Sequence, residues 1–397
     1  MSASAPPLVA SRARWVLDTI GARDVALGDD IPFRAQAWEQ LERGERPEGD
    51  ELAEAFFHLA RIEERGGARD RHGRFPAGAS SFDPLDPPLE SLRRRLGVEP
   101  PRWRGARFAV ALTHDVDVPW RWTRAGVRAA AGRLRRGAWR EAGALAAVPL
   151  HRLRGTDPNW RFDRIVRLER QADARSTFFV LAGHNHAADG PAADVDLYDD
   201  LRPKVVDTIA ASGMEIGLHG SYTAADDDGR LANEKSVLEA IAGPVRGQRY
   251  HYLRLDPHRN LAPLERLGFA YDSTLGYPGG LGFRAGISHP FRPWSVDEDR
   301  PLDLLEIPLA IMDVTLAERR YLGLSPRAAW PRVERLLDWA AEHGGGFAIL
   351  WHADRFDPWT AGGWDRLYTR ILSAVHERGG VCLSAGELAE EAVAWAS

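Results

Sequence analysis

The stretch Phe108-Ala-Val-Ala-Leu-Thr-His-Asp-Val-Asp117 joins an apolar run to a cluster of polar and acidic residues. A short apolar run bounded in this way is typical of a strand that is buried on both faces of a parallel sheet. Because side chains alternate along a strand, Asp115 and Asp117 are predicted to lie on one face, just beyond the buried part. The sequence therefore predicts a buried strand that brings two carboxylates to one end of a sheet.

Similar apolar runs recur along the rest of the chain and alternate with helical patterns. Strands are predicted at residues 108–113, 177–181, 214–218, 248–253, 269–273, 304–309, 347–351 and 381–384. Helices are predicted between them at residues 162–172, 203–212, 231–241, 260–267, 326–343, 364–378 and 386–395. Seven or eight such units predict an α/β fold, an irregular (β/α) barrel, with a doubly wound open sheet as the alternative. No glycine-rich phosphate loop follows the first strand, which disfavours a nucleotide-binding version of the open sheet.

Residues 1–98 differ from this pattern and are predicted to form a mostly helical accessory region. A helical pattern covers residues 52–62, and the proline-rich segment 75–88 is predicted to be a loop. Pro100-Pro101 is the expected boundary, so the barrel is assigned to residues 99–397.

An arginine- and alanine-rich insertion at about residues 120–153 interrupts the barrel pattern after the first strand. Two interpretations of this insertion remain open. A basic helix there can make a peripheral contact with an anionic membrane surface or with a lipid-linked substrate. Alternatively, a solvated helix packs over the barrel.

Composition restricts the class of protein. The 397 residues are 44% hydrophobic and 27% charged, as in an ordinary folded protein rather than a disordered chain. The formal net charge of -5 gives no reason to expect a nucleic acid partner. The single cysteine, Cys382, excludes an internal disulfide, and the sequence shows neither a signal-peptide pattern nor a long apolar span. We therefore expect a cytoplasmic protein without a transmembrane segment.

The predicted strands end in residues that suit metal chemistry. Two strands end in histidine, His219 and His352, and alternation places Arg249 and His251 on a shared face of a third. The carboxyl ends of barrel strands form the active-site rim. Imidazole and carboxylate together favour a divalent metal, zinc first, with cobalt, nickel or manganese as alternatives. A carboxylate beside such an ion can accept a proton from bound water, and a second imidazole can protonate a leaving amine.

From about residue 107 to its end, the chain resembles the polysaccharide (chitooligosaccharide) deacetylases, which are metal-dependent amide hydrolases on a distorted (β/α) barrel. The resemblance rests on four motifs in the same order: Thr113-His-Asp-Val-Asp117, Glu215-Ile-Gly-Leu-His219-Gly-Ser-Tyr222, Arg249-Tyr-His-Tyr252 and Leu350-Trp-His352. It implies that Asp115 is the base and that Asp117 and His219 are metal ligands. It further implies that Arg249 supports the base and that His352 is the general acid.

The second and third motifs depart from the family pattern. The family places two histidines four residues apart, but the second position here is Thr223. His251 replaces the usual proline of the third motif, and it is our candidate for the third metal ligand because alternation points it into the same site. The alternative is that His251 only forms a hydrogen bond with Asp115 or the substrate. In that case Tyr222, Ser221 or a water molecule completes the coordination.

Further residues are assigned to the substrate. The runs Tyr271-Asp-Ser-Thr274 and Gly282-Phe-Arg-Ala-Gly286 resemble a bacterial subgroup of the family whose N-terminal extension also resembles residues 1–98. Three tryptophans are candidates for a flat wall against a sugar ring: Trp351, Trp359 and Trp364. The expected substrate-binding residues are Tyr222, Tyr252, Asp272, Arg284 and Trp351.

Together these implications predict a metal-dependent hydrolase that removes an N-acetyl or similar acyl group from an amino sugar or glycan precursor. A hydrolase that acts on a different amide C–N bond is one alternative. A catalytically decayed, carbohydrate-binding barrel is the other. The missing histidine at Thr223 favours decay, whereas the presence of both Asp115 and His352 argues against it.

Overall fold

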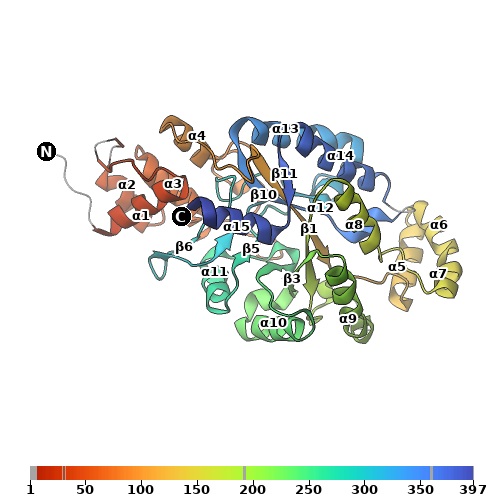
Figure 1. The fold of residues 1–397 in the computed structure, drawn as a ribbon. Coiled ribbons are helices and arrows are strands. Elements are labelled where there is room, and N and C mark those ends of the chain that lie inside the picture. Colours follow the sequence, from red (N-terminus) through yellow and green to blue (C-terminus); the bar gives the residue numbers. More distant parts are fainter. Residues whose placement is uncertain (1–6, 29, 32, 191–193, 358–360, 397) are drawn as a thin grey trace.

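A nine-stranded parallel sheet forms the centre of the fold (Figure 1). The computed structural model describes residues 7–28, 30–31, 33–190, 194–357 and 361–396. The strands of the sheet are β1 (Phe108–Val116), β2 (Thr177–Leu181), β3 (Glu215–Gly220), β4 (Gly247–Tyr250), β5 (Tyr271–Asp272), β8 (Leu305–Glu306), β9 (Leu309–Met312), β10 (Gly345–Leu350) and β11 (Val381–Leu383). Neighbouring strands follow the order β8-β5-β4-β3-β2-β1-β10-β9, and β11 pairs with β1. A separate antiparallel pair is formed by β6 (Trp294–Ser295) and β7 (Arg300–Pro301).

The two ends of the sheet are joined by one interrupted strand. β8 pairs with β5 and β9 pairs with β10, yet only Ile307-Pro308 separates β8 from β9. A parallel bridge between Gly276 and Leu309 continues the β5 side of this connection. Proline lacks an N–H group for the ladder, which explains the break within the predicted strand 304–309. The sheet therefore curls round as the distorted (β/α) barrel that the sequence predicts.

Alternation along β1 separates the interior of the barrel from the helical layer. All nine residues of β1 are buried. Thr113 and Asp115 contact Arg249 of β4. His114, between them, points the other way and binds Glu169 on a surrounding helix at 2.8 Å. The interior face of β1 therefore leads directly to the two predicted carboxylates.

Helices surround the barrel, with α13 and α14 along one side and α9 and α10 along the other (Figure 1). They are α8 (Phe162–Gln171), α9 (Val195–Ala211), α10 (Asp228–Ala242), α11 (Pro257–Arg266), α12 (Asp313–Ala317), α13 (Pro326–His343), α14 (Trp364–Glu377) and α15 (Ala385–Ala396). The buried positions of α8 are Phe162, Ile165, Val166 and Glu169, the spacing of a helix that packs by one face. Only α9 differs clearly from its prediction: the sequence predicts a helix that begins at Pro203, but the helix begins at Val195 and Pro203 lies inside it.

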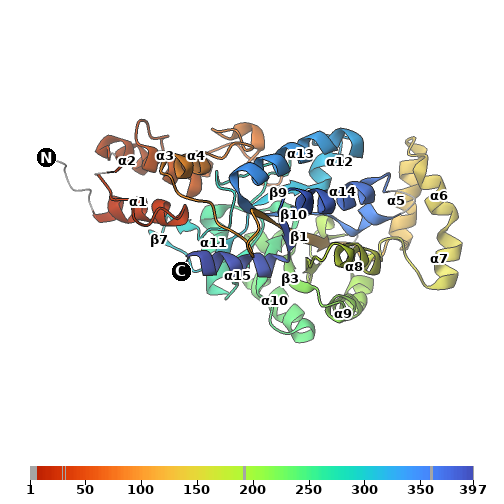
Figure 2. The ribbon, with the colours of Figure 1, turned by 45° about the horizontal axis from the view of Figure 1, so that its top comes forward.

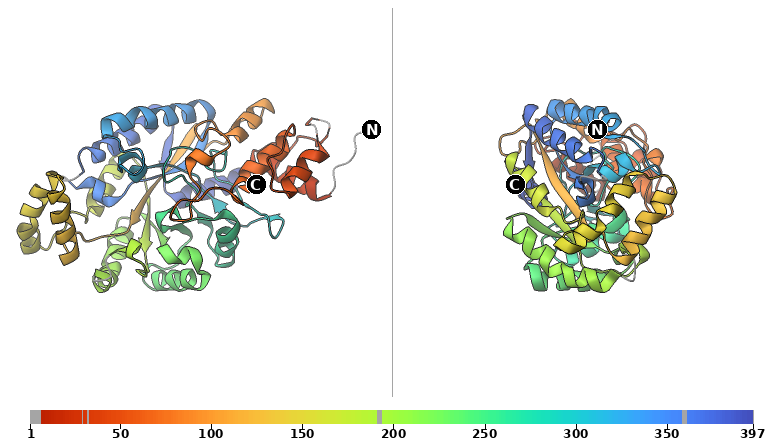
Figure 3. Two further views of the ribbon diagram at one scale, coloured as in Figure 1. Left: turned by 180° about the vertical axis from the view of Figure 1, so that it is seen from behind. Right: turned by 90° about the vertical axis from the view of Figure 1, so that its right-hand side faces the viewer.

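The N-terminal region contributes α1 (Pro7–Thr19), α2 (Ala35–Glu42), α3 (Glu51–Leu59) and α4 (Pro88–Arg95). The first three of these helices lie at one end of the molecule (Figures 1 and 3). Their apolar side chains belong to the same hydrophobic cluster as the outer face of the barrel. Residues from the segment between α3 and α4 also reach the carboxyl ends of the strands, as the site shows below.

The arginine-rich insertion forms α5 (Arg124–Arg135), α6 (Arg140–Ala146) and α7 (Val148–Arg154). These helices project from the end of the molecule opposite α1 and α2 (Figures 1 and 2). They enclose a small cluster of their own, made of Trp122, Ala130, Ala144 and Val148. The insertion therefore stands apart from the barrel instead of lying over it. Within the described residues, no helix has the length and apolar character that crossing a membrane requires.

Candidate active site

The carboxyl ends of four strands meet at one small cluster of ionisable side chains. Asp115 is the penultimate residue of β1, and Asp117 directly follows that strand. His219 comes from β3, His251 follows β4, and His352 lies two residues after β10. The structure therefore brings together five residues that are far apart in the sequence, because parallel strands place their carboxyl ends at the same rim.

Three of these residues form a candidate metal centre. The ligating atoms of Asp117, His219 and His251 all lie within 4.8 Å of one another. His219 Nε2 is 3.1 Å from Asp117 Oδ1, and His251 Nε2 is 3.6 Å from Asp117 Oδ2. Asp117 Oδ1 and His219 Nε2 are buried, and neither atom has a hydrogen-bond partner among the described residues. Buried polar atoms are seldom left in this state, and two imidazoles with one carboxylate are a ligand set that suits Zn²⁺, so the residues fit a divalent ion.

Hydrogen bonds orient both histidines toward that position. His219 Nδ1 lies 2.9 Å from the Arg249 carbonyl oxygen, and His251 Nδ1 lies 2.8 Å from Asp189 Oδ1. An oxygen acceptor at Nδ1 favours the tautomer whose Nε2 carries a free lone pair, the usual arrangement behind a metal-binding histidine. Burial alone lowers the pKa of His251, but the charges of Asp117 and Asp189 outweigh burial and raise it to about 9 in the metal-free protein.

Sequence reasoning missed Asp189. This residue ends a short 3-10 helix, η3 (Ala187–Asp189), in the polar loop after β2, and its side chain is buried. Asp189 also accepts hydrogen bonds from the backbone N–H groups of His186 and Tyr222. These contacts fix the carboxylate behind His251. The loop has no hydrophobic periodicity, so the sequence offered only the presence of an acid among histidines as a signal.

Thr223, the position where the family has a second histidine, does not belong to this cluster. It lies in η5 (Tyr222–Asp226), and its hydroxyl is buried with no hydrogen-bond partner in the described part of the chain. His251 approaches Asp117 from β4 instead. Among the described residues, His251 therefore offers a third ligand after a different strand.

Asp115 is held by a buried arginine. Arg249 Nη1 donates to Asp115 Oδ1 at 2.9 Å and to Thr113 Oγ1 at 2.8 Å. The same guanidinium donates to the backbone carbonyl of Ser273 at 2.7 Å and lies over the Phe179 ring. Asp115 Oδ2, on the other side of the carboxylate, lies 3.5 Å from His219 Nε2. One oxygen is therefore fixed by charge pairing, and the other faces the metal position.

His352 stands across the cluster and has its own partner. Its Nδ1 lies 2.7 Å from Asp313 Oδ1, and Arg355 donates to Asp313 Oδ2 at 3.1 Å. Its Nε2 is 3.7 Å from Asp117 Oδ2, so the free nitrogen faces the site. Burial lowers the pKa of His352, but Asp313 and the two site aspartates outweigh burial and raise it to about 10. The direction of this shift favours the protonated form of His352. Asp313, at the start of α12, was also missed from sequence.

The backbone beside the cluster has an uncommon conformation. Tyr252 and Leu253 are consecutive left-handed residues, with φ of 63° and 54°. A non-glycine residue in the left-handed region raises the free energy of the folded state by about 1–2 kcal/mol, so the surrounding contacts must stabilise this turn. Arg74, from the N-terminal region, donates to the Tyr252 carbonyl at 2.7 Å, and Arg254 donates to the His72 carbonyl at 3.1 Å. The N-terminal region thus braces the rim of the site.

Two adjoining hollows, of about 190 Å³ and 220 Å³, flank the cluster. Their shared lining consists of Asp115, Asp117, Val118, Val314, Arg320 and His352. Tyr252 lines the first hollow. Tyr222 is absent from the described lining of both, and its ring packs between His186 and the Arg254 guanidinium. A substrate in these hollows would lie across the candidate metal centre.

Besides Tyr222, three residues expected to bind substrate are not brought to the hollows. Trp351 is fully buried and packs on Trp364 and Tyr368, because alternation turns it away from the face that His352 occupies. Arg284 is fully buried in an ion pair with Glu64 at 2.6 Å. The expectation that Trp351 and Arg284 contact substrate is therefore corrected to structural roles.

Asp272 is the third of these residues. It is fully buried and accepts hydrogen bonds from Gln248 and Thr274. Gln248 and Asp272 are paired in register, and they lie on the face of the sheet opposite to Arg249. Asp272 therefore also has a structural role. Trp359, the remaining tryptophan of the expected sugar wall, lies outside the described residues.

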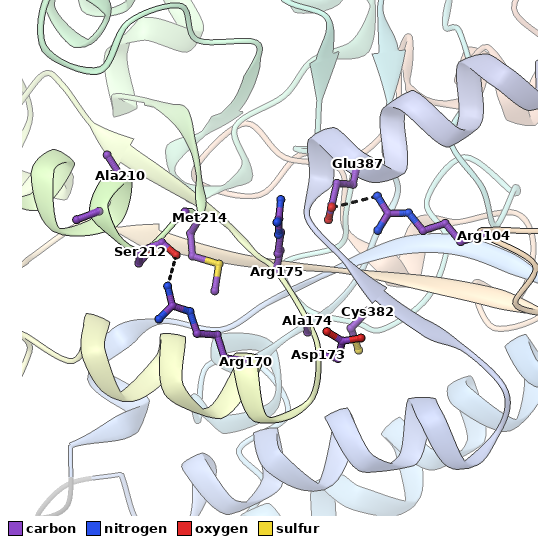
Figure 4. Close-up of a pocket in the computed structure, with 12 residues that line it drawn as sticks. Arg104, Arg170, Asp173, Ala174, Arg175, Ala210, Ser212, Met214, Cys382 and Glu387 are labelled. Carbon is purple, nitrogen blue, oxygen red and sulfur yellow. Dashed lines mark hydrogen bonds and ion pairs between the residues drawn. The ribbon is translucent and has the colours of Figure 1, made fainter.

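A further hollow, of about 860 Å³, lies at the other end of the strands (Figure 4). It is lined by residues that precede β2 and β3, such as Arg175 and Met214. Figure 4 shows Arg104 paired with Glu387 and Arg170 bound to the Ser212 carbonyl. Burial raises the pKa of Cys382, at its edge, to about 12, so this thiol is not a nucleophile. In barrels the amino-terminal end serves stability, and the site is therefore placed at the opposite end.

Solved structures share this architecture. A protein from Mycobacterium smegmatis assigned to the polysaccharide deacetylases superimposes with a TM-score of 0.50 at 20% identity, covering 75% of this chain and 94% of its own. The chain has the polysaccharide deacetylase fold. A protein from Pseudomonas aeruginosa PAO1 with the same assignment gives a TM-score of 0.49 at 14% identity, with 74% and 93% covered. A mutant of a CE4 family pseudoenzyme gives 0.38 at 12% identity, with 73% and 71% covered. No family model and no curated protein matches the sequence.

Proposed function

We propose that this chain is a metal-dependent hydrolase that removes an N-acetyl or similar acyl group from an amino sugar or glycan precursor. The observation that carries the proposal is the position of two opposed groups beside the candidate metal centre. Asp115 is paired with Arg249 on one side, and His352 is paired with Asp313 on the other. A base and an acid on either side of a ligand cluster are what amide hydrolysis requires.

In this proposal Asp117, His219 and His251 hold a divalent metal, zinc first. When bound, the metal polarises the acyl carbonyl and lowers the pKa of bound water. Cobalt, nickel and manganese are alternatives that the same ligands accept. The tautomers fixed by the Arg249 carbonyl and Asp189 present Nε2 of both histidines to the ion.

The protein groups then divide the proton transfers. Asp115 accepts the proton of the attacking water, and a hydrogen bond from the Arg249 guanidinium fixes one oxygen of its carboxylate. The backbone N–H of Tyr252 stabilises the negative charge that develops on the carbonyl oxygen. His352, kept protonated by Asp313, donates its Nε2 proton to the departing amine. The amine is thereby released as a neutral leaving group.

Carbohydrate is the proposed substrate class because the neighbouring structures are assigned to polysaccharide deacetylases. A hydrolase of a different amide would need the same metal, base and acid, so it remains the alternative within enzymes. The decayed barrel is less well supported, because a pure binding protein has no need for the paired Asp115 and His352.

Metal content and acyl release test this proposal together. The purified protein should contain about one divalent ion per chain by elemental mass spectrometry, in keeping with the one ligand set found among the described residues. It should also release acetate from N-acetylated amino sugars or their nucleotide- or lipid-linked forms. Chelation should abolish release, and added Zn²⁺ or Co²⁺ should restore it. A chain that binds no divalent ion and gains no activity from added metal would rule out the catalytic proposal and favour the decayed barrel.

A further inference from the structure

The outer face of the insertion carries an apolar stripe that nothing in the described chain covers. α6 and α7 are joined through Ala147, which has helical dihedral angles (φ −80°, ψ −11°), so they form a nearly continuous helix. Exposed apolar residues recur along this helix and the turn before it at Trp139, Ala142, Ala146, Leu150 and Leu153. We call these five residues the outer stripe.

The spacing of the outer stripe places its members on one face. Steps of three and four residues return to the same side of a helix with 3.6 residues per turn. The opposite face, through Ala144 and Val148, already packs against the cluster formed with α5. Trp139 is 78% exposed, and Leu153 is 85% exposed. Internal packing of the insertion therefore does not explain why the outer stripe is apolar.

Arginines surround the outer stripe. Residues 120–156 contain nine arginines and a single acidic residue, Glu141. Arg135 and Arg136 lie beside Trp139, and Arg152 and Arg154 flank Leu153; all four are exposed. None of these four arginines has an ion-pair partner among the described residues. The whole chain has a net charge of -5, so the concentration of positive charge here is local.

We propose that the outer stripe docks on an anionic lipid surface. Trp and Leu side chains enter the interface between head groups and acyl chains, while the flanking arginines contact anionic head groups. A second copy of this chain would instead bring two arginine-rich faces together, which repel. A nucleic acid would satisfy the charges but leave Leu150 and Leu153 in water.

The two ends of the insertion join the barrel beside the candidate site. Asp157 accepts hydrogen bonds from the backbone N–H groups of Arg121 and Trp122, which ties the two ends of the insertion together. Asn159 donates to the Val118 carbonyl at 2.8 Å. Pro119 and Asn159 line the hollow beside Asp117. Docking would therefore hold this hollow next to the lipid surface. A glycan carried on an anionic lipid would lie at the same surface, and it is the substrate that we infer. This last step, unlike docking itself, rests on the proposed function.

Vesicle co-sedimentation of the full chain tests the docking. We expect the protein to sediment with vesicles of phosphatidylcholine mixed with phosphatidylglycerol, to stay in solution with phosphatidylcholine alone, and to be released as salt is raised. Reversal of four charges (R135E, R136E, R152E and R154E) should weaken binding by roughly a hundredfold or more. Truncation of the stripe (W139A with L153A) should weaken it by about tenfold or more.

Matched controls exist elsewhere on the surface. Val237 and Ile241 are exposed apolar residues of α10, and Arg327 and Arg332 are exposed arginines of α13. The V237A/I241A and R327E/R332E variants should bind vesicles like the unaltered protein. Circular dichroism should show that all variants remain folded.

Three outcomes would overturn the proposal. They are equal binding to neutral vesicles, binding that both stripe variants retain, and binding of DNA with no binding of vesicles. Because sedimentation needs no catalysis, an inactive protein that docks would leave this inference intact while refuting the proposed function. The proposed lipid-linked substrate is then tested by comparing the rate of acyl release from a glycan carried on vesicles with the rate from a water-soluble glycan. Stripe variants should lose only the vesicle-borne activity.

Discussion

The guanidinium of Arg74 donates a hydrogen bond of 2.7 Å to the backbone carbonyl of Tyr252, across 178 residues of sequence. Asp70 and the Tyr321 hydroxyl hold the same guanidinium. The strained turn at Tyr252 and Leu253 therefore depends on the N-terminal region for its position. This region takes part in forming the rim of the barrel.

Substitution of Arg74 by alanine should lower kcat by about a hundredfold with a smaller change in KM, because a slightly displaced Tyr252 N–H acts mainly on the transition state. Steady-state kinetics should show this change, and free guanidinium should restore part of the rate. Arg102→Ala, at an exposed arginine distant from the site, should leave both constants unaltered. An unchanged kcat in Arg74→Ala would contradict the bracing role.

The two aspartates at the carboxyl end of β1, Asp115 and Asp117, should have different functions. Asp115→Asn should reduce turnover by more than about a hundredfold while metal stays bound, because it removes the base but no ligand. Asp117→Asn should lose the metal as well as the activity. Elemental analysis of both variants, beside acetate release, distinguishes the two results. If both variants keep metal and activity, the assigned roles are wrong.

Asp189 should strengthen metal binding without touching the ion. Asp189→Asn weakens the acceptor behind His251, so metal affinity should fall by about 10–100-fold. Competition with a chromophoric chelator measures this change. Asp207→Asn, at an exposed position of α9, provides the matched control. Equal affinities in the two variants would show that Asp189 does not support a ligand.

Arg284 should govern stability instead of substrate binding. Arg284→Ala leaves Glu64 buried without its closest partner, and we expect a loss of about 3–5 kcal/mol in the free energy of unfolding. Urea denaturation measures this loss. If the variant keeps its stability but binds substrate weakly, the structural role is wrong.

The same ion pair predicts a dependence of stability on pH. Burial alone raises the pKa of Glu64, but Arg284 and Arg61 outweigh burial and lower it to about 2 from its ordinary value of 4.5. The Glu64 contribution to stability is therefore fully present above pH 4.5 and is lost as the pH falls toward 2. The acid-unfolding profile of the Glu64→Gln variant should lack this component.

Much of the candidate site follows from strand periodicity. Apolar runs mark the strands, alternation places Asp115 and Asp117 together, and parallel strands bring His219, His251 and His352 to the same rim. The same alternation turns Trp351, which adjoins His352, to the opposite face, so its assignment to the substrate was wrong. The local sequence therefore predicts where a side chain points wherever strand alternation alone decides its direction.

Other parts of the site were decided by the tertiary structure. Asp189 meets His251 across 62 residues, and Asp313 meets His352 across 39. Arg74 and Asp189 come from loops, and loops have no repeating dihedral angles from which a side chain's direction can be derived. The sequence by itself determined the strands and the residues at the strand ends, because each depends on local periodicity, whereas the choice between a barrel and an open sheet depended on the pairing of β8 and β9. Only the folded chain decided which acids support those histidines and which arginine braces the turn, because those contacts depend on the paths of distant loops.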